Sequence, residues 1–252
     1  MTDTVSDGIK RAGRVVGVPG SARGPFVFTC DHASNHVPGL SPSPSDSALL
    51  NQHWGWDIGA ASVVESLCQY SDSVAVLTCV SRLVIDVNRA PDSETLVVTQ
   101  CEDVTLDMNS AVDSAEIERR TATVFHPFHS MVESTMEASL KRHPVNLVSI
   151  HSFTPIWAGV QRAMEIGILF DRYEEDALRL QAALAAEGFL TELNAPYSGL
   201  TGELMYSAAR HGDKYQRPYL ELEIRQDLIS SPEGVRIVSE KIARALSVFR
   251  PR

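Results

Sequence analysis

The chain lacks long hydrophobic runs, has few cysteines and carries little positive charge, and each shortage excludes a class of protein. No apolar stretch approaches the roughly 20 residues that cross a bilayer, and the first residues lack the basic and then apolar order of a secretory signal. Lysine and arginine total 22 against 32 aspartates and glutamates, a net charge of −10. Because phosphate backbones bind cationic surfaces, we expect no nucleic-acid partner. We also expect no membrane partner and a cytoplasmic location.

The four cysteines show no CxxC pair and no dense framework, so we expect reduced thiols. They are Cys30, Cys68, Cys79 and Cys101. The chain of 252 residues, 44% hydrophobic and 21% charged, is typical of a globular protein with a sizeable core. The polar, glycine-rich residues 1–24 predict a mobile lead-in, and residues 25–252 a single domain.

Apolar runs rich in β-branched residues alternate with segments of helical periodicity. Strands are predicted at residues 25–29, 74–80, 83–87, 147–152, 165–170 and 219–224. Helices are predicted at residues 57–70, 114–142, 173–187 and 232–249, the second of them interrupted or kinked at Pro127. The proline- and serine-rich residues 38–47 predict an exposed loop. The alternation predicts a three-layer α/β domain with a mixed, mainly parallel sheet flanked by helices.

A polar cluster, CDHASNHVP at residues 30–38, directly follows the first predicted strand. The strand at residues 147–152 likewise ends in a histidine. Open α/β sheets build their sites at the carboxyl ends of strands, so His32 and His151 would converge on one ion if these strands are neighbours. The pair predicts a metal site, and zinc in hydrolases takes three protein ligands and an open position for water.

The third ligand is either Asn35, three residues after His32, or Asp57, at a predicted helix start. A neutral amide is a weak zinc ligand, so we favour Asp57. The other explanation of Asp57 is a plain helix cap.

A metal-activated water needs a base to accept its proton. Glu221 and Glu223 alternate on one predicted strand and therefore share a face. Glu223, nearer the carboxyl end, is the predicted base, and Glu221 is the reserve. The alternative is that both glutamates lie on a solvated strand face.

Arg82 and Arg89 flank an apolar run, and a guanidinium group suits bidentate capture of a carboxylate. Arg89, directly after Asn88, is the predicted carboxylate anchor, and Arg82 is predicted to stabilise an oxyanion. The alternative is that both are surface arginines paired with Asp86 or Asp92.

Six further histidines are isolated and are better explained as surface or core residues. They are His36, His53, His126, His129, His143 and His211. His126 and His129 have helical i, i+3 spacing, but Pro127 lies between them. Ser34 with His32 as its base would make a serine amidase, although no GxSxG elbow surrounds Ser34.

Four motifs occur in order: CDHASN at residues 30–35, WDIGA at 56–60, SRLVIDVNR at 81–89 and IHSFTP at 150–155. With them, residues 25–230 resemble the N-formylglutamate amidohydrolases, a family similar in site design to zinc carboxypeptidases and acylamino-acid deacylases. The resemblance implies a zinc-carboxypeptidase-like fold. In the carboxypeptidases a glutamate lies three residues after the first histidine ligand, whereas this chain has Asn35.

The resemblance implies hydrolysis of an N-formyl or other N-acyl amino acid, such as N-formyl-L-glutamate to formate and glutamate, a step of histidine breakdown. It implies one zinc, or another divalent ion, per chain. The ligands would be His32, Asp57 and His151. Glu223 would move the proton and Arg82 would steady the oxyanion. The residues assigned to the small acidic substrate are Arg89, Asn88, Ser34 and Asn35.

Two other functions stay open. A metal-free serine amidase would survive chelation and be blocked by serine-directed reagents. A non-catalytic binder of acidic metabolites would keep Arg89 and its carboxylate pocket but lack turnover even when loaded with metal.

Overall fold

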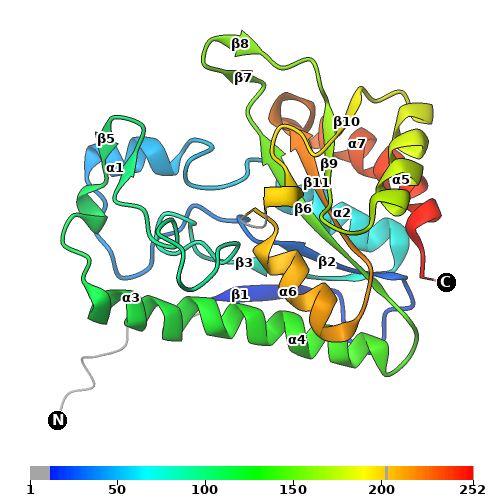
Figure 1. Cartoon of the computed structure of the whole chain (residues 1–252), viewed down its shortest axis with the longest axis horizontal. Coiled ribbons are helices and arrows are strands. Elements are labelled where there is room, and N and C mark those ends of the chain that lie inside the picture. The colour runs from blue at the N-terminus through cyan, green and yellow to red at the C-terminus, as the bar shows by residue number, and fades with distance from the viewer. Residues whose placement is uncertain (1–11, 202–203, 252) are drawn as a thin grey trace.

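A seven-stranded sheet forms the centre of the computed structural model, which describes residues 12–201 and 204–251 (Figure 1). In spatial order its strands are β1 (Gly13–Val16), β3 (Val74–Thr78), β2 (Phe26–Cys30), β6 (Asn146–Phe153), β11 (Tyr219–Arg225), β9 (Ile166–Leu169) and β10 (Thr191–Leu193). The β1–β3 and β11–β9 pairs are antiparallel and the other four pairs are parallel. The predicted mixed, mainly parallel sheet is therefore confirmed.

Helices cover both faces of this sheet (Figure 1). One face packs against α2 (Ala60–Ser71), α5 (Glu174–Ala186) and α7 (Pro232–Ala245). The other face packs against α4 (His126–Leu140) and α6 (Tyr206–Tyr215). All residues of β2, β3 and β6 are buried, as expected for strands covered on both sides. None of the helices in the described ranges is both long and apolar enough to span a bilayer.

The predicted helix over residues 114–142 continues past Pro127 through a local change of hydrogen bonding. After α3 (Ser114–Arg120) comes a π-helical turn, Thr121–Phe125, and then α4, with Pro127 in its first turn. Proline cannot donate a backbone N–H, and its ring crowds the preceding turn. The wider π turn directly before it lets the helix continue, so the interruption is a π segment and not a break.

Two segments predicted to lie outside regular structure are partly built into it. The predicted lead-in over residues 1–24 contains β1, which pairs with β3 at the edge of the sheet; residues 1–11 lie outside the described residues. A strand of four residues containing a glycine gives too weak a pattern to be recognised. The predicted loop over residues 38–47 ends at Ser43, which caps α1 (Pro44–Leu50) in a capping box with Asp46.

The apolar run at residues 83–87 is buried but is not a strand. Ser81 Oγ accepts a hydrogen bond from the N–H of Leu83, and Asp86 Oδ1 accepts one from the N–H of Asn88. Such bonds from a side chain to nearby backbone favour turns over an extended ladder. Residues 81–89 therefore fold as successive turns.

Two small hairpins lie outside the main sheet: β4 (Gln100–Cys101) with β5 (Val104–Thr105), and β7 (Ile156–Trp157) with β8 (Val160–Gln161). The β7–β8 hairpin projects from the body of the molecule at the top of Figure 1. Strands of two residues are too short to show alternation, so the sequence does not predict them.

Candidate functional site

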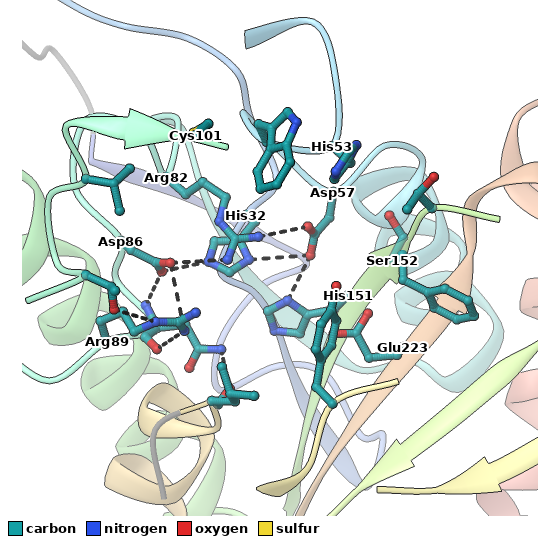
Figure 2. Close-up of a pocket in the computed structure, with 18 of the residues that line it drawn as sticks. His32, His53, Asp57, Arg82, Asp86, Arg89, Cys101, His151, Ser152 and Glu223 are labelled. Atoms are coloured by element: carbon teal, nitrogen blue, oxygen red, sulfur yellow. Dashed lines mark hydrogen bonds and ion pairs between the residues drawn. The ribbon is translucent and has the colours of Figure 1, made fainter. Parts of the chain in front are cut away.

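A cavity of about 310 Å³ opens at the carboxyl ends of β2, β6 and β11. This volume is near the lower end of the range for small-molecule sites. Its charged and imidazole lining includes His32, Asp57, Arg82, Asp86, Arg89, His151, Glu221 and Glu223 (Figure 2). With Asn88, which also lines it, the cavity brings together eight residues that the sequence analysis singles out for catalysis or binding, the reserve base Glu221 among them. It adds Asp86.

The two predicted histidine ligands face each other. His32 follows β2, and His151 lies in the neighbouring strand β6, with 5.0 Å between the ring centroids. Asp57 Oδ2 lies 2.8 Å from His151 Nδ1 and 3.5 Å from His32 Nδ1. Asp57 is not a helix cap, because α2 begins at an N-cap glycine, Gly59, without a side-chain bond. His32, Asp57 and His151 each offer a donor atom within 4.8 Å of the other two.

The hydrogen bonds of the outer ring nitrogens suit metal ligation. His32 Nε2 lies 2.7 Å from Asp86 Oδ1, so its N–H is donated there and Nδ1 keeps its lone pair. Nδ1 is buried and has no hydrogen-bond partner in the part of the chain that the structure describes. His151 Nε2 lies 3.0 Å from Ser149 Oγ and 3.6 Å from Asp31 Oδ2, on the ring edge away from Asp57. Metal-bound histidines usually hold their second nitrogen in this way.

The charges around this cluster also favour the binding of a cation. Burial lowers the pKa of His151, but the carboxyl groups of Glu221, Asp31 and Asp57 outweigh it and hold that pKa well above its usual value. Although burial opposes ionisation of Asp57, its two histidine neighbours lower its pKa. A buried carboxylate beside two imidazoles is a donor set that fits a zinc-type ion.

Both glutamates of β11 are buried, at 2% and 5% exposure, and not on a solvated face. In the parallel register Glu223 is paired with His151 and Glu221 with Ser149. Desolvation raises the pKa of Glu221 to about 8 and that of Glu223 to about 7. Glu221, Glu223 and His151 form a second group of nearby donors, but carboxyl groups that hold protons near neutral pH are poorer ligands than the ionised Asp57.

The two arginines are held differently. Arg82 lies between two carboxylates, 3.5 Å from Asp57 Oδ1 and 3.3 Å from Asp86 Oδ2. Arg89 donates to the carbonyl of Asn88 and to Thr95 Oγ1, and its nearest carboxylate, Asp86, is 3.9 Å away. Arg89 is therefore the less neutralised guanidinium group in the cavity.

Three predicted substrate residues have other partners. The Asn88 amide donates to the carbonyl of Leu204, and its oxygen accepts from the N–H of Ser207, so it lines the cavity but holds the start of α6. Ser34 Oγ accepts from the N–H of His36.

Asn35 donates to Asn51 Oδ1. Neither Ser34 nor Asn35 lines the cavity. The chain turns away after His32, whose carbonyl accepts from the N–H of Asp57. Ser34 and Asn35 therefore lie outside this cavity, which does not support the roles predicted for them: both as substrate contacts, Asn35 as ligand and Ser34 as nucleophile. Those roles stay predictions.

Several site residues were not predicted from the sequence. Asp86 lies 2.7 Å from the outer nitrogen of His32, Asp31 lies 3.6 Å from that of His151, and Trp54 and Trp157 line the cavity. Asp31 could have been noticed as a carboxylate between a buried strand and His32. The isolated His129 and His211 form a buried pair behind the site, 2.9 Å apart.

The sequence matches the N-formylglutamate amidohydrolase family over residues 24–230. Among solved structures, it is similar to gene product Atu2144 from Agrobacterium tumefaciens, with 30% identity, a TM-score of 0.83 and coverage of 95% of this chain and 96% of that one. It also shares its fold with an N-formylglutamate amidohydrolase from Ralstonia eutropha JMP134, with 17% identity, a TM-score of 0.71 and coverage of 92% and 94%. No curated protein matches the chain. The match over residues 24–230 places this chain in the N-formylglutamate amidohydrolase family.

Proposed function

We propose that this protein is a metal-dependent amidohydrolase that cleaves the amide bond of an N-acyl amino acid, with N-formyl-L-glutamate as the first substrate to test. The observation that carries the proposal is the convergence of His32, Asp57 and His151 in one cavity with Glu223 and Arg89. The family match supports the reaction class.

Three donor atoms would hold the metal: His32 Nδ1, His151 Nδ1 and a carboxylate oxygen of Asp57. A divalent ion bound there, zinc first among the candidates, would polarise the amide carbonyl and make water ionise more readily. Asp86 fixes the tautomer of His32 through the 2.7 Å contact at Nε2. Loss of such an outer partner typically weakens metal affinity about 10- to 100-fold.

The remaining steps fall to residues of the chain. Glu223 is buried beside His151 and has a pKa of about 7, so it can accept a proton at neutral pH and return it to the leaving nitrogen. Arg82 would stabilise negative charge on the carbonyl oxygen. Arg89, whose nearest carboxylate among the described residues is 3.9 Å away, would bind the α-carboxylate of the substrate.

The test is metal content together with hydrolysis of N-formyl-L-glutamate before chelation, after chelation and after return of zinc. We expect about one zinc per chain, the stoichiometry of a mononuclear site, and activity that disappears and returns. His32→Ala should lose both, whereas His36→Ala, an exposed histidine four residues away, should keep both.

The outcomes separate the candidate functions. Activity that survives chelation would contradict the metal mechanism. Substrate binding without turnover in the zinc-loaded protein would favour a non-catalytic binder of acidic metabolites.

A further inference from the structure

The cavity has two chemically different sides. Figure 2 shows Arg89 and Asp86 on one side, His53, Ser152 and Glu223 on the other, and His32 and His151 between them. The anion-binding group and the metal candidates are thus arranged in sequence across the cavity.

A cluster of aromatic rings lines the cavity around His53, which lies on the side away from Arg89 in Figure 2. We call His53, Trp54, Phe153 and Trp157 the aromatic wall; all four line the cavity. The His53 ring centroid is 4.5 Å from that of Trp54 and 6.0 Å from that of Trp157, and the two indoles are 5.9 Å apart. Trp157 keeps 42% of its surface exposed. Such a ring cluster in a cavity lining, with one partly exposed member, can bury apolar surface of a ligand.

The aromatic wall is preformed. The guanidinium group of Arg162 lies over the rings of Phe153 and Trp157, 5.3 and 5.4 Å from their centroids. Arg162 also ties the base of the β7–β8 hairpin, since its N–H donates to Pro155 and its side chain to the carbonyl of Thr154. A wall fixed in this way loses little conformational freedom when a ligand binds.

The order of groups in an N-acyl amino acid determines which part of the substrate would face the aromatic wall. With the α-carboxylate at Arg89 and the scissile carbonyl near His32 and His151, an extended substrate would continue toward the opposite side of the cavity, where His53 and Ser152 lie in Figure 2. The group that arrives there is the acyl substituent. In a formyl compound that substituent is hydrogen, which would leave the wall uncovered.

We infer that the acyl group of the substrate is aromatic or bulky and apolar, of the benzoyl class, and packs against Trp54 and Trp157. The inference rests on the proposed function and specifies its substrate. An acidic acyl group fits less well, because carboxyl groups border this side, with Glu223 shown there in Figure 2 and Glu102 also in the lining. Two cations lie near the wall: Arg162 is already engaged with two rings and a carbonyl, and Arg82 lies between Asp57 and Asp86.

The test compares kcat/KM for N-benzoyl-, N-acetyl-, N-succinyl- and N-formyl-L-glutamate with the zinc-loaded enzyme. We expect the benzoyl compound to exceed the acetyl compound by about tenfold or more, the scale of discrimination set by apolar pockets. Trp157→Ala should lower the benzoyl-to-formyl ratio by about tenfold, and Trp157→Phe should restore most of it. Val160→Ala, on the same hairpin but 68% exposed and outside the lining, should leave the ratio unchanged.

The possible results divide cleanly. The acyl assignment would be overturned by a higher kcat/KM for the formyl or succinyl compound, or by an equal loss of kcat/KM on all compounds in Trp157→Ala. Hydrolysis itself would still support the proposed function. If no compound is hydrolysed, the proposed function fails. Calorimetric titration with N-benzoyl-L-glutamate then decides whether the aromatic wall binds the acyl group. Binding that Trp157→Ala weakens and Val160→Ala does not would uphold the wall as the acyl site; equal binding by both variants would overturn it.

Discussion

At the scale of single residues, the two glutamates of β11 differ in what they face. Glu221 Oε1 lies 3.6 Å from His151 Nε2, the ring nitrogen that points away from Asp57. Glu223 is two residues nearer the carboxyl end of the strand and is in register with His151. Its carboxyl group interacts electrostatically with Asp57 and Arg82. In the proposed mechanism, Glu221 would therefore orient the ligand His151, and Glu223 would exchange protons with substrate.

Replacing Glu223 with glutamine should lower kcat by about a hundredfold or more, because an amide cannot accept the proton. Zinc content should stay the same, since the ligand set does not include Glu223. Measured in parallel, Glu221→Gln should lower kcat less. A larger loss in Glu221→Gln than in Glu223→Gln would move the base to Glu221.

The sequence predicts the residues that converge in the cavity, but not the residues that hydrogen-bond to them from behind. His32, His151 and Glu223 follow or end apolar strands, so their convergence can be inferred once the strands are taken as neighbours. Asp86 comes from a run of turns whose position is set by tertiary hydrogen bonds, including Asp86 N–H to the carbonyl of Leu96. Asn35 is near His32 in sequence but faces Asn51, because a change of chain direction leaves no trace in residue spacing.

At the scale of elements, β1 shows how a weak sequence pattern can still form part of a core. Arg14 forms an ion pair with Glu65 of α2, and Val16 packs against the core cluster on that face. On the opposite side, a Cβ added to Gly13 would lie 2.8 Å from the carbonyl oxygen of Leu77 and 2.6 Å from the terminal methyl of Met131. The strand therefore sits between both helical layers. Period-two alternation over four residues could not reveal this, whereas the long strands β6 and β11 were recognisable from their apolar runs.

Gly13→Ala should lower the free energy of unfolding by about 1–3 kcal/mol, the usual cost of forcing an extra methyl into a packed site. The contact with the backbone of Leu77 cannot be relieved by a rotamer change, although the Met131 methyl can move. Denaturant unfolding would measure the change, with Val18→Ala, 65% exposed in the same segment, as the control. Equal stability of the two variants would mean that β1 contributes little to the fold.

At the scale of the whole molecule, buried polar groups connect the site to the helical layer behind it. Asp31 accepts hydrogen bonds from Ser149 of β6 and from Ser207 of α6. One turn further along α6, His211 lies 2.9 Å from His129 of α4. The second ring nitrogen of each histidine is buried and makes no hydrogen bond to a side chain among the described residues. The α4–α6 layer is thus held by imidazoles that must stay neutral, since a buried charge there would have no counter-ion in contact.

This pair should make the protein sensitive to acid. Burial, with the added effects of His211 on His129 and of Arg210 on His211, lowers the pKa of His129 to about 3 and that of His211 to about 4 from the usual 6.5. As the pH falls below about 6.5, the unfolded chain binds protons on these side chains while the folded protein does not, so the free energy of unfolding falls with pH. Each histidine contributes a slope of up to about 1.4 kcal/mol per pH unit between about pH 6.5 and its folded pKa.

Denaturant unfolding from pH 4.5 to 7.5 would measure this slope in the wild type, in His211→Gln and in the exposed-site control His36→Gln. We expect His211→Gln to be less stable at pH 7.5, because its side chain packs less well beside His129, but to lose less stability on acidification. The metal-site groups are the same in all three proteins, so their contribution cancels in the differences. The expected change is in the slope of the free energy of unfolding against pH, and not only in stability at one pH. A variant that is merely less stable would give a curve parallel to that of the wild type. That result would show that the His129–His211 pair does not cause the loss of stability in acid.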